Sequence, residues 1–167
     1  MPKREQLTGE QRLPPSHRST NKYSVHHNTS SDILDGIVYP TLGEVDLDPC
    51  DNETSIVVAK RKVRWPMEDG LKVVWGPKRV FCNPPWGDEL WDWVRKMLFE
   101  NKKNGAEIVA VIPHNESARW WDLVAAGFDA AFQWGPGAST RRVRYRGNKN
   151  GAPSGTCIGY LLSLIHI

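Results

Sequence analysis

Apolar residues along the chain form short runs that predict strands. Glu107–Pro113 is predicted as a strand, because its apolar run is typical of a central strand buried on both faces, as in parallel sheets. Glu44–Asp48 alternates between polar and apolar residues, and Arg79–Cys82 carries two β-formers. Two more strands are predicted over Phe128–Trp134 and Thr156–Leu162. Turn residues separate these runs, so we expect several strands of one sheet.

Stretches between these runs have helical periodicity. The clearest helix follows Asp88, a candidate N-cap, carries apolar residues on one face and stops at Gly105. Further helices are predicted over Ser31–Val38, with Ser31 as N-cap, over Thr54–Lys62, and over Ala118–Ala126. Because strands and helices alternate, we predict an α/β fold with helices on both faces of the sheet.

Composition narrows the class of protein. A chain of 167 residues with 40% hydrophobic and 25% charged residues is typical of one globular domain. No apolar run approaches the roughly 20 residues that span a bilayer, and no secretory signal is visible. Three cysteines without C-x-x-C spacing, and His26-His27 without partners at ligand spacing, predict neither a disulfide framework nor a metal site. We expect a cytoplasmic monomer that binds no membrane and no metal.

The domain boundaries follow from composition as well. Residues 1–22 are polar, basic and Pro-containing, which predicts a disordered arm. The folded domain is expected over residues 23–162. Residues 163–167 form an apolar tail that resembles a translated adapter sequence and is expected to be non-native.

Asn83-Pro84-Pro85-Trp86 is the stretch with a candidate chemistry, directly between a predicted strand and the clearest helix. Neither proline can donate a backbone N–H, and their fixed φ angles hold a turn at the end of the strand. The Asn83 amide oxygen and the Pro84 carbonyl are then two neighbouring acceptors beside an indole. This set suits a planar base with an exocyclic amine, because two acceptors take its two protons while the indole stacks on its face.

The amine of adenine or cytosine is a poor nucleophile, because its lone pair is delocalised into the ring. Acceptors for both N–H bonds draw the nitrogen toward tetrahedral geometry and aim its lone pair at an electrophile. The stretch resembles the Asn/Asp-Pro-Pro-aromatic signature of amino-group methyltransferases that use S-adenosylmethionine. Taken alone, the same four residues also fit a Pro-rich loop before a helix with a core Trp.

Acidic and basic residues add two candidate binding regions. Asp48-Pro49 ends a predicted strand, where open α/β sheets bind ligands, although such a pair alone is more often a turn. Lys60–Arg64 is one basic cluster, and Arg141–Arg146 is a second with an interleaved tyrosine. Two such clusters favour phosphate contacts with nucleic acid, and a solvated basic hairpin is the alternative for each.

From about Tyr23 to Leu162 the chain resembles the phage-type Dam family of DNA N-6-adenine methyltransferases. The order and spacing of five segments carry this resemblance. They are LDPCDN (Leu47–Asn52), DGL followed by a Trp (Asp69–Leu71, Trp75), VFCNPPWG (Val80–Gly87), the Trp91–Lys96 helix and IVAVIPHNESARWW (Ile108–Trp121).

The resemblance implies a Rossmann-like class I methyltransferase sheet, S-adenosylmethionine as cofactor and DNA as partner, in a phage or prophage protein of a bacterial cell. It implies that Asn83 and Pro84, with Pro85, hold the target amine and that Trp86 stacks on the flipped adenine. The implied cofactor-binding residues are Asp48, Pro49, Cys50, Asn52, Asp69 and Leu71. Our assignment of DNA phosphate contacts to Arg141, Arg142, Arg144 and Arg146 rests on charge alone.

One departure keeps alternatives open. The glycines of the broad methyltransferase motif I are absent, since Asp51, Asn52 and Glu53 follow Cys50. The alternatives are methylation of the N-4 amine of cytosine, of RNA or of a protein Gln, and a non-catalytic nucleic-acid-binding relative. Asn before Pro-Pro favours adenine or Gln, and the basic clusters disfavour Gln.

The arginine cluster generates a prediction about DNA binding. Neutralising Arg141, Arg142, Arg144 and Arg146 together should weaken DNA binding and flatten its salt dependence, because fewer counterions are released. The affinity for S-adenosylmethionine should not change. Trp86→Ala should instead lower the methylation rate and keep the salt slope. Salt titrations of DNA affinity measure both, and an unchanged slope in the arginine variant would show that the cluster is only a solvated surface.

Overall fold

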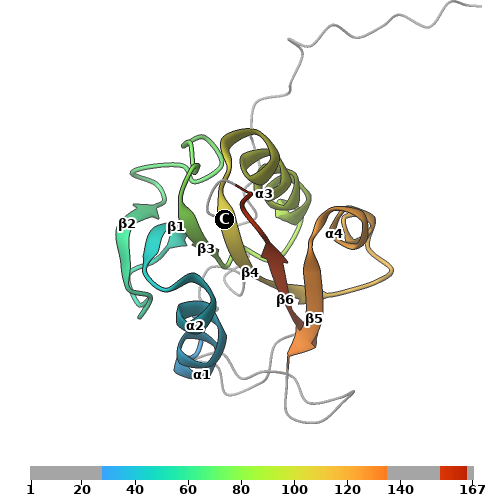
Figure 1. The fold of residues 1–167 in the computed structure, drawn as a ribbon, viewed down its shortest axis with the longest axis horizontal. Coiled ribbons are helices and arrows are strands. Elements are labelled where there is room, and N and C mark those ends of the chain that lie inside the picture. The colour runs from blue at the N-terminus through green and yellow to red at the C-terminus, as the bar shows by residue number, and fades with distance from the viewer. Residues whose placement is uncertain (1–27, 135–154, 165–167) are drawn as a thin grey trace, which may run out of the picture.

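The computed structural model describes residues 28–134 and 155–164. In this part of the chain, six strands form one mixed sheet with the order β2-β1-β3-β4-β6-β5 (Figure 1). The strands are β1 (Val45–Asp51), β2 (Ala59–Arg64), β3 (Arg79–Cys82), β4 (Glu107–His114), β5 (Ala130–Trp134) and β6 (Gly155–Leu161). The predicted α/β class is confirmed as a mixed α/β domain.

Four neighbouring strands are parallel. β1 pairs with β2 on one side and with β3 on the other, and β3 pairs with β4, all in the same direction. The carboxyl ends of these strands therefore meet at one edge of the sheet. β6 lies between β4 and β5 and is antiparallel to both. The predicted central strand is β4, which is buried continuously from Ile108 to Pro113.

Helices cover both faces of the sheet, as predicted (Figure 1). They are α1 (Ser31–Ile33), the π-helical turn η1 (Leu34–Val38), α2 (Tyr39–Leu42), α3 (Leu90–Asn104) and α4 (Trp121–Gly127). Successive residues of β3 point to opposite sides: Val80 and Cys82 join the core under α3, while Phe81 joins the core under α1 and η1. This alternation follows from the two-residue period of a strand.

The sequence of α3 explains its position and its end. Leu90, Trp93, Val94 and Met97 are buried on the face toward the sheet. Gly105 adopts φ 72° and donates its N–H to the carbonyl of Asn101, a left-handed C-terminus that glycine favours. The predicted N-cap was wrong: the helix begins at Leu90 after Glu89, and no side chain caps it. A turn from Gly87 to Leu90 takes the place of the cap.

The helix predicted over residues 54–62 was wrong, since Ala59–Arg64 is the edge strand β2. Pairing with β1 buries the β-branched Val63 in the core, and this tertiary contact outweighs local propensity. The other predicted helices exist with shifted bounds. The first continues past Val38 to Leu42 and is preceded by Ser30 instead of capped by Ser31, and the last starts at Trp121.

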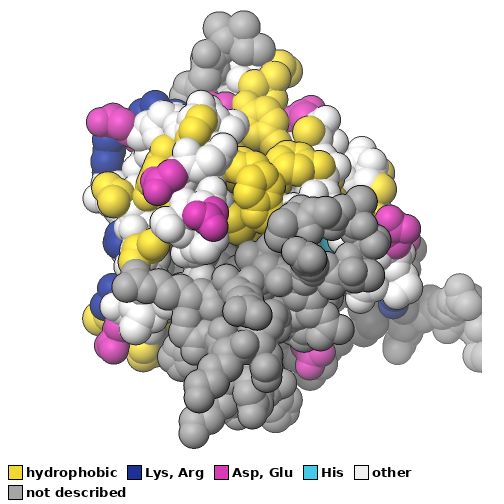
Figure 2. All heavy atoms as spheres, turned by 90° about the horizontal axis from the view of Figure 1, so that it is seen from below, with side chains coloured by type: hydrophobic (Ala, Val, Ile, Leu, Met, Phe, Trp, Pro, Cys, Tyr) yellow, Lys and Arg dark blue, Asp and Glu magenta, His cyan; other side chains and the backbone are white. Residues whose placement is uncertain are grey.

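The basic cluster on β2 is paired with carboxylates. Lys60 contacts Glu44 and Asp46, and Arg61 contacts Glu68. Lys62 and Arg64 both contact Asp51. Figure 2 shows Lys and Arg side chains along the left-hand edge of the molecule, the side of β2 in Figure 1, with acidic side chains beside them. The positive charge of this cluster is therefore largely neutralised within the protein.

Several predicted features lie outside the described residues: the whole arm over residues 1–22, the arginines 141, 142, 144 and 146, and residues 165–167. Ser163 is buried and donates its hydroxyl to the carbonyl of Gly105.

Within the described part of the chain, no helix is both long and apolar enough to cross a membrane.

A buried acid joins α3 to the loop before β3. Glu100 is 1% exposed, and its Oε2 accepts hydrogen bonds from the backbone N–H groups of Trp75 and Gly76 and from Asn104 Nδ2. Lys96 Nζ lies 2.6 Å from its Oε1. Burial raises the pKa of Glu100, but the bonds from Lys96, Asn104 and Trp75 outweigh it and hold the pKa below its ordinary value.

Glu100→Gln should lower the free energy of unfolding by about 2–4 kcal/mol at pH 7, because charged hydrogen bonds are lost in a buried site. The folded pKa lies below the unfolded one, so the difference should shrink as the pH falls through that lowered pKa. Urea unfolding at several pH values measures the difference in the free energy of unfolding between the wild type and Glu100→Gln. Glu116→Gln, at a largely exposed side chain, is the control and should change stability by less than about 0.5 kcal/mol. If Glu100→Gln and Glu116→Gln changed the stability equally, the Glu100 carboxylate would not be what stabilises the contact between α3 and the loop before β3.

Candidate active site

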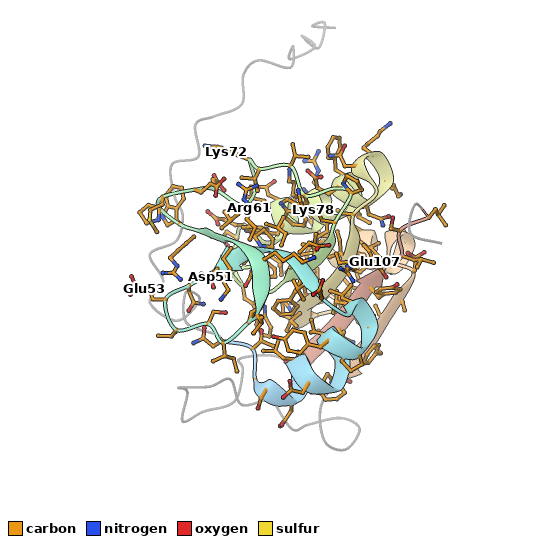
Figure 3. The ribbon with its side chains drawn as sticks, turned by 60° about the vertical axis from the view of Figure 1, so that its left-hand side comes forward. Asp51, Glu53, Arg61, Lys72, Lys78 and Glu107 are labelled. Atoms are coloured by element: carbon orange, nitrogen blue, oxygen red, sulfur yellow. The ribbon has the colours of Figure 1, made fainter. Side chains whose placement is uncertain are left out.

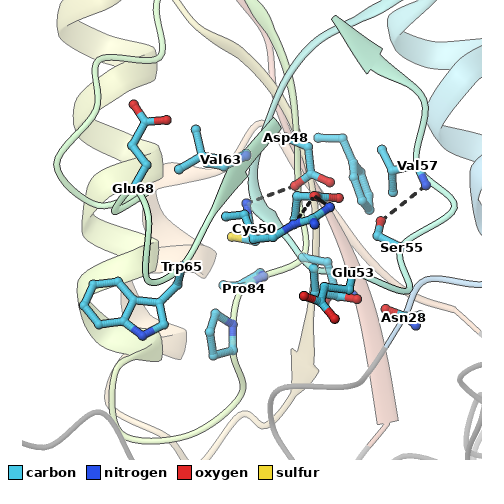
Figure 4. Close-up of a pocket in the computed structure, with 18 of the residues that line it drawn as sticks. Asn28, Asp48, Cys50, Glu53, Ser55, Val57, Val63, Trp65, Glu68 and Pro84 are labelled. Atoms are coloured by element: carbon cyan, nitrogen blue, oxygen red, sulfur yellow. Dashed lines mark hydrogen bonds and ion pairs between the residues drawn. The ribbon is translucent and has the colours of Figure 1, made fainter. Parts of the chain in front are cut away.

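A cavity of about 490 Å³ opens at the carboxyl ends of β1, β2 and β3. In Figure 4, Trp65 and Pro84 lie on one side of it and Asn28 on the other, with Asp48 and Cys50 between them. Figure 3 shows Asp51 and Glu53 at the side of the molecule away from Glu107, the first residue of β4. The cavity thus lies toward the carboxyl ends of the parallel strands, as Asp48-Pro49 predicted, but the predicted strand end was wrong because β1 continues to Asp51.

Seven of the ten residues predicted for catalysis and cofactor binding line this cavity. They are Asp48, Pro49, Cys50, Asn52, Asn83, Pro84 and Pro85. β1 and β3 are neighbours, with Leu47 opposite Val80, so residues from two separate segments of the sequence meet at one edge. The Cys50 and Cys82 sulfur atoms, 3.6 Å apart, connect the two strand ends.

Asn83 follows β3 directly and is held from a distant part of the chain. Its Nδ2 donates a hydrogen bond of 3.0 Å to Thr29 Oγ1. Pro84 is buried and Pro85 half-buried beside it. Because the amide nitrogen is bound to Thr29, the plane and the direction of the Asn83 amide are set within the cavity wall.

Asp48 is the buried acid of the cavity, with 3% of its surface exposed. Its Oδ1 accepts a hydrogen bond of 2.9 Å from the Cys50 N–H. Burial, with a smaller contribution from the charge of Asp51, raises the pKa of Asp48 to about 7, while the Cys50 bond and Lys62 act in the opposite direction. The carboxyl group therefore changes charge near neutral pH.

Asp51 lies at the end of β1 and is also buried, but it is paired. Its Oδ2 accepts from Arg64 Nη2 at 2.7 Å and from Nε at 3.0 Å. Lys62 lies 3.4 Å from the other oxygen. Asp51 is thus contacted by two basic residues of β2, and these contacts join the ends of β1 and β2 at the rim of the cavity.

Asp69 and Leu71, predicted to bind the cofactor, do not line the cavity, although Gly70 between them does. Asp69 Oδ1 accepts from the Leu71 N–H, and Leu71 packs against the core. A Cβ on Gly70 would lie 2.0 Å from the Pro49 carbonyl oxygen, so only glycine fits this close approach. The roles of Asp69 and Leu71 stay predictions.

Trp86, predicted to stack on the target base, lies in the core between the sheet and the N-terminal helices. It is 9% exposed and packs in one cluster with Ile33, Phe81 and Val109. It is not among the residues that line the cavity. Its stacking role stays a prediction.

Some residues of the cavity wall were not predicted. Asn28 and Thr29 precede the first helix, and their only signal in the sequence is polarity next to a helix start. Trp65, 55% exposed, directly follows β2 and lies just beyond the helix wrongly predicted over residues 54–62. Both segments are far in sequence from the Asn-Pro-Pro stretch.

The charge of the cavity wall favours a cation. Asp48, Asp51, Glu53, Glu68 and Glu89 line it, with Arg64 as the basic residue among the described lining side chains. Two of these acids are neutralised by ion pairs, Asp51 by Arg64 and Glu68 by Arg61. A positively charged or neutral ligand fits such a wall better than a phosphate does. Among the described residues, no group of His, Cys, Asp and Glu has the arrangement of a metal site.

Asp48→Asn tests the buried acid. With a folded pKa near 7 and an unfolded pKa near 3.8, wild-type stability should fall as the pH rises from about 4 to 7. The Asn variant keeps the acceptor for Cys50 but cannot ionise, so it should be more stable at pH 8, by on the order of 2–4 kcal/mol. Urea unfolding between pH 4 and 8 measures this. Parallel curves for the two proteins would contradict the assignment.

Comparison with known proteins adds an independent finding. The family model described as DNA N-6-adenine-methyltransferase (Dam) matches residues 26–132, well over half of the chain. The match includes Asn28, Thr29, the end of β1 and the whole Asn-Pro-Pro-Trp stretch. No curated protein and no solved structure shows a significant match. The chain belongs to the Dam family of DNA N-6-adenine-methyltransferases.

Proposed function

We propose that the protein transfers a methyl group from S-adenosylmethionine to the N6 amine of adenine in DNA, in a site-specific manner. The observation that carries the proposal is that Asp48, within β1, and Asn83, directly after the neighbouring parallel strand β3, line one cavity. The membership of the family supports the same reaction class.

The residues of the cavity fit S-adenosylmethionine. A volume of about 490 Å³ is in the range of small-molecule sites, and the wall is acidic. The cofactor carries a sulfonium and an ammonium group, and the buried Asp48 carboxylate is a suitable partner for a cation. Pro49, Cys50 and Asn52 would hold it on the side of β1. When bound, the cofactor supplies an electrophilic methyl group.

The fold agrees with this assignment. The parallel order β2-β1-β3-β4 and the antiparallel strand β6 inserted before β5 support a Rossmann-like class I methyltransferase sheet. Ligands of open α/β sheets bind at the carboxyl ends of the strands, which is where the cavity lies.

Asn83 Oδ1 and the Pro84 carbonyl would accept hydrogen bonds from the two N–H groups of the adenine amine. No strong base is required, because preorganised acceptors raise the electron density available at the nitrogen. The bound Asn83 amide and the two prolines reduce the motion of these acceptors.

DNA would have to present the base outside the duplex, which costs a few kcal/mol of stacking and pairing. The basic residues of β2 are already paired with acids, so they are poor candidates for offsetting this cost. This pairing leaves Arg141, Arg142, Arg144 and Arg146 as our proposed phosphate contacts.

Asn83→Ala should lower the methylation rate about 100-fold or more, as expected for one lost polar group at a reacting centre. Affinity for S-adenosylmethionine should stay within a few-fold. Transfer of labelled methyl groups to unmethylated DNA and calorimetry with the cofactor measure the two effects. Asn115→Ala, at an exposed position outside the cavity, is the matched control.

Activity of Asn83→Ala within threefold of wild type would contradict the proposed acceptor. Parallel assays with DNA lacking adenine, with RNA and with a Gln-containing peptide test the other substrates. Absence of cofactor binding in the wild-type protein would instead favour a non-catalytic relative, the alternative raised by the missing motif I glycines.

A further inference from the structure

A chain of hydrogen bonds connects the N-terminal segment to both sides of the cavity. Asn28 Nδ2 donates to Thr54 Oγ1 at 2.6 Å and to the Thr54 carbonyl at 3.2 Å. Thr54 in turn donates from its N–H and its hydroxyl to Asn52 Oδ1. On the other side, Asn83 Nδ2 donates to Thr29 Oγ1.

Thr29 is well suited to hold another side chain in place. Asn28 and Thr29 are 7% and 4% exposed, so both side chains are largely enclosed by the protein. The bonds to Thr54 anchor Asn28 on the loop after β1, and the peptide bond carries this restraint to Thr29. The hydroxyl therefore sits on a fixed part of the wall, although 54 residues separate it from Asn83 in the sequence.

The direction of the Asn83 amide matters for the proposed reaction. A primary amide has an acceptor end and a donor end, and the adenine amine offers only N–H donors to the acceptors. If the amide rotated by half a turn, its NH₂ group would face the target NH₂ group and bind it poorly. The contact with Thr29 engages the nitrogen, so the oxygen, which has less than 1 Å² of exposed surface, is the other end of the amide.

We propose that Thr29 is a positioning residue, whose hydroxyl keeps the Asn83 amide turned with its oxygen toward the target amine. This inference rests on the proposed function. It adds a role for a residue outside the Asn-Pro-Pro-Trp stretch. Thr29 touches Asn83 and is not required to touch the base itself.

Two variants at position 29 and one at position 83 test the proposal in a methyl-transfer assay. Thr29→Val keeps the shape of the side chain without its hydroxyl and should lower kcat roughly tenfold, the effect of about one hydrogen bond. KM for DNA should stay within about twofold. Thr29→Ser restores the hydroxyl and should keep kcat within about threefold of wild type. The matched control is Thr156→Val, the same change at a buried threonine of β6 outside the cavity lining, and it should keep the wild-type kcat.

The third variant, Asn83→Asp, separates orientation from packing. A carboxylate has an acceptor at both ends, so its direction no longer matters. Thr29→Val should therefore cost little further activity in the Asn83→Asp background. A packing role would instead give the same loss in both backgrounds, together with a lower melting temperature. If Asn83→Asp methylates DNA too slowly to be measured, the comparison of kcat between Thr29→Val and Thr29→Ser decides whether the hydroxyl of Thr29 is required.

Two results would overturn the inference: a wild-type kcat in Thr29→Val, or equal losses in Thr29→Val and Thr29→Ser. Failure of the proposed function looks different, because the wild-type protein itself would then transfer no methyl group to DNA, and the inference would fail with it. A folded, active wild type with an unaffected Thr29→Val variant rejects the positioning role alone.

Discussion

The parallel pairing of β1 with β3 is the contact on which the site depends. Leu47 lies opposite Val80, and both are fully buried, so the register is held by the core and not by the site itself. A slip of one residue would turn every side chain to the opposite face. Because the register is fixed, the strands end together, and Asp48 and Asn83 share a cavity although they belong to different segments.

Polar groups near the cavity are supported by partners from other elements. Glu100 of α3 holds the backbone of Trp75, and the Trp75 indole N–H donates to the carbonyl of Gly70, which lies against Pro49. The core under α3 is thereby linked to the wall of the site by buried hydrogen bonds. Such networks are rigid when every member is satisfied, which suits acceptors that must be preorganised.

Charge is separated between the cavity and the outer strand. The cavity wall is acidic and contains a carboxyl group, Asp48, whose burial keeps its pKa near 7. The basic side chains of β2 form ion pairs with acids such as Asp46 and Asp51. The proposed cationic cofactor would therefore be attracted to the cavity, whereas the paired side chains of β2 offer little free positive charge to a nucleic acid.

The sequence by itself determined the α/β class, the buried strand β4, the helix α3 with its stop at Gly105, and the candidate chemistry of Asn83-Pro84, because these depend on local periodicity and on the chemistry of single residues. It did not determine β2, since pairing with β1 outweighed local helical propensity. Nor did it show the antiparallel insertion of β6, the core position of Trp86, or the contact of Thr29 with Asn83. Only the tertiary structure decided these, because each depends on contacts between segments that are far apart in the chain.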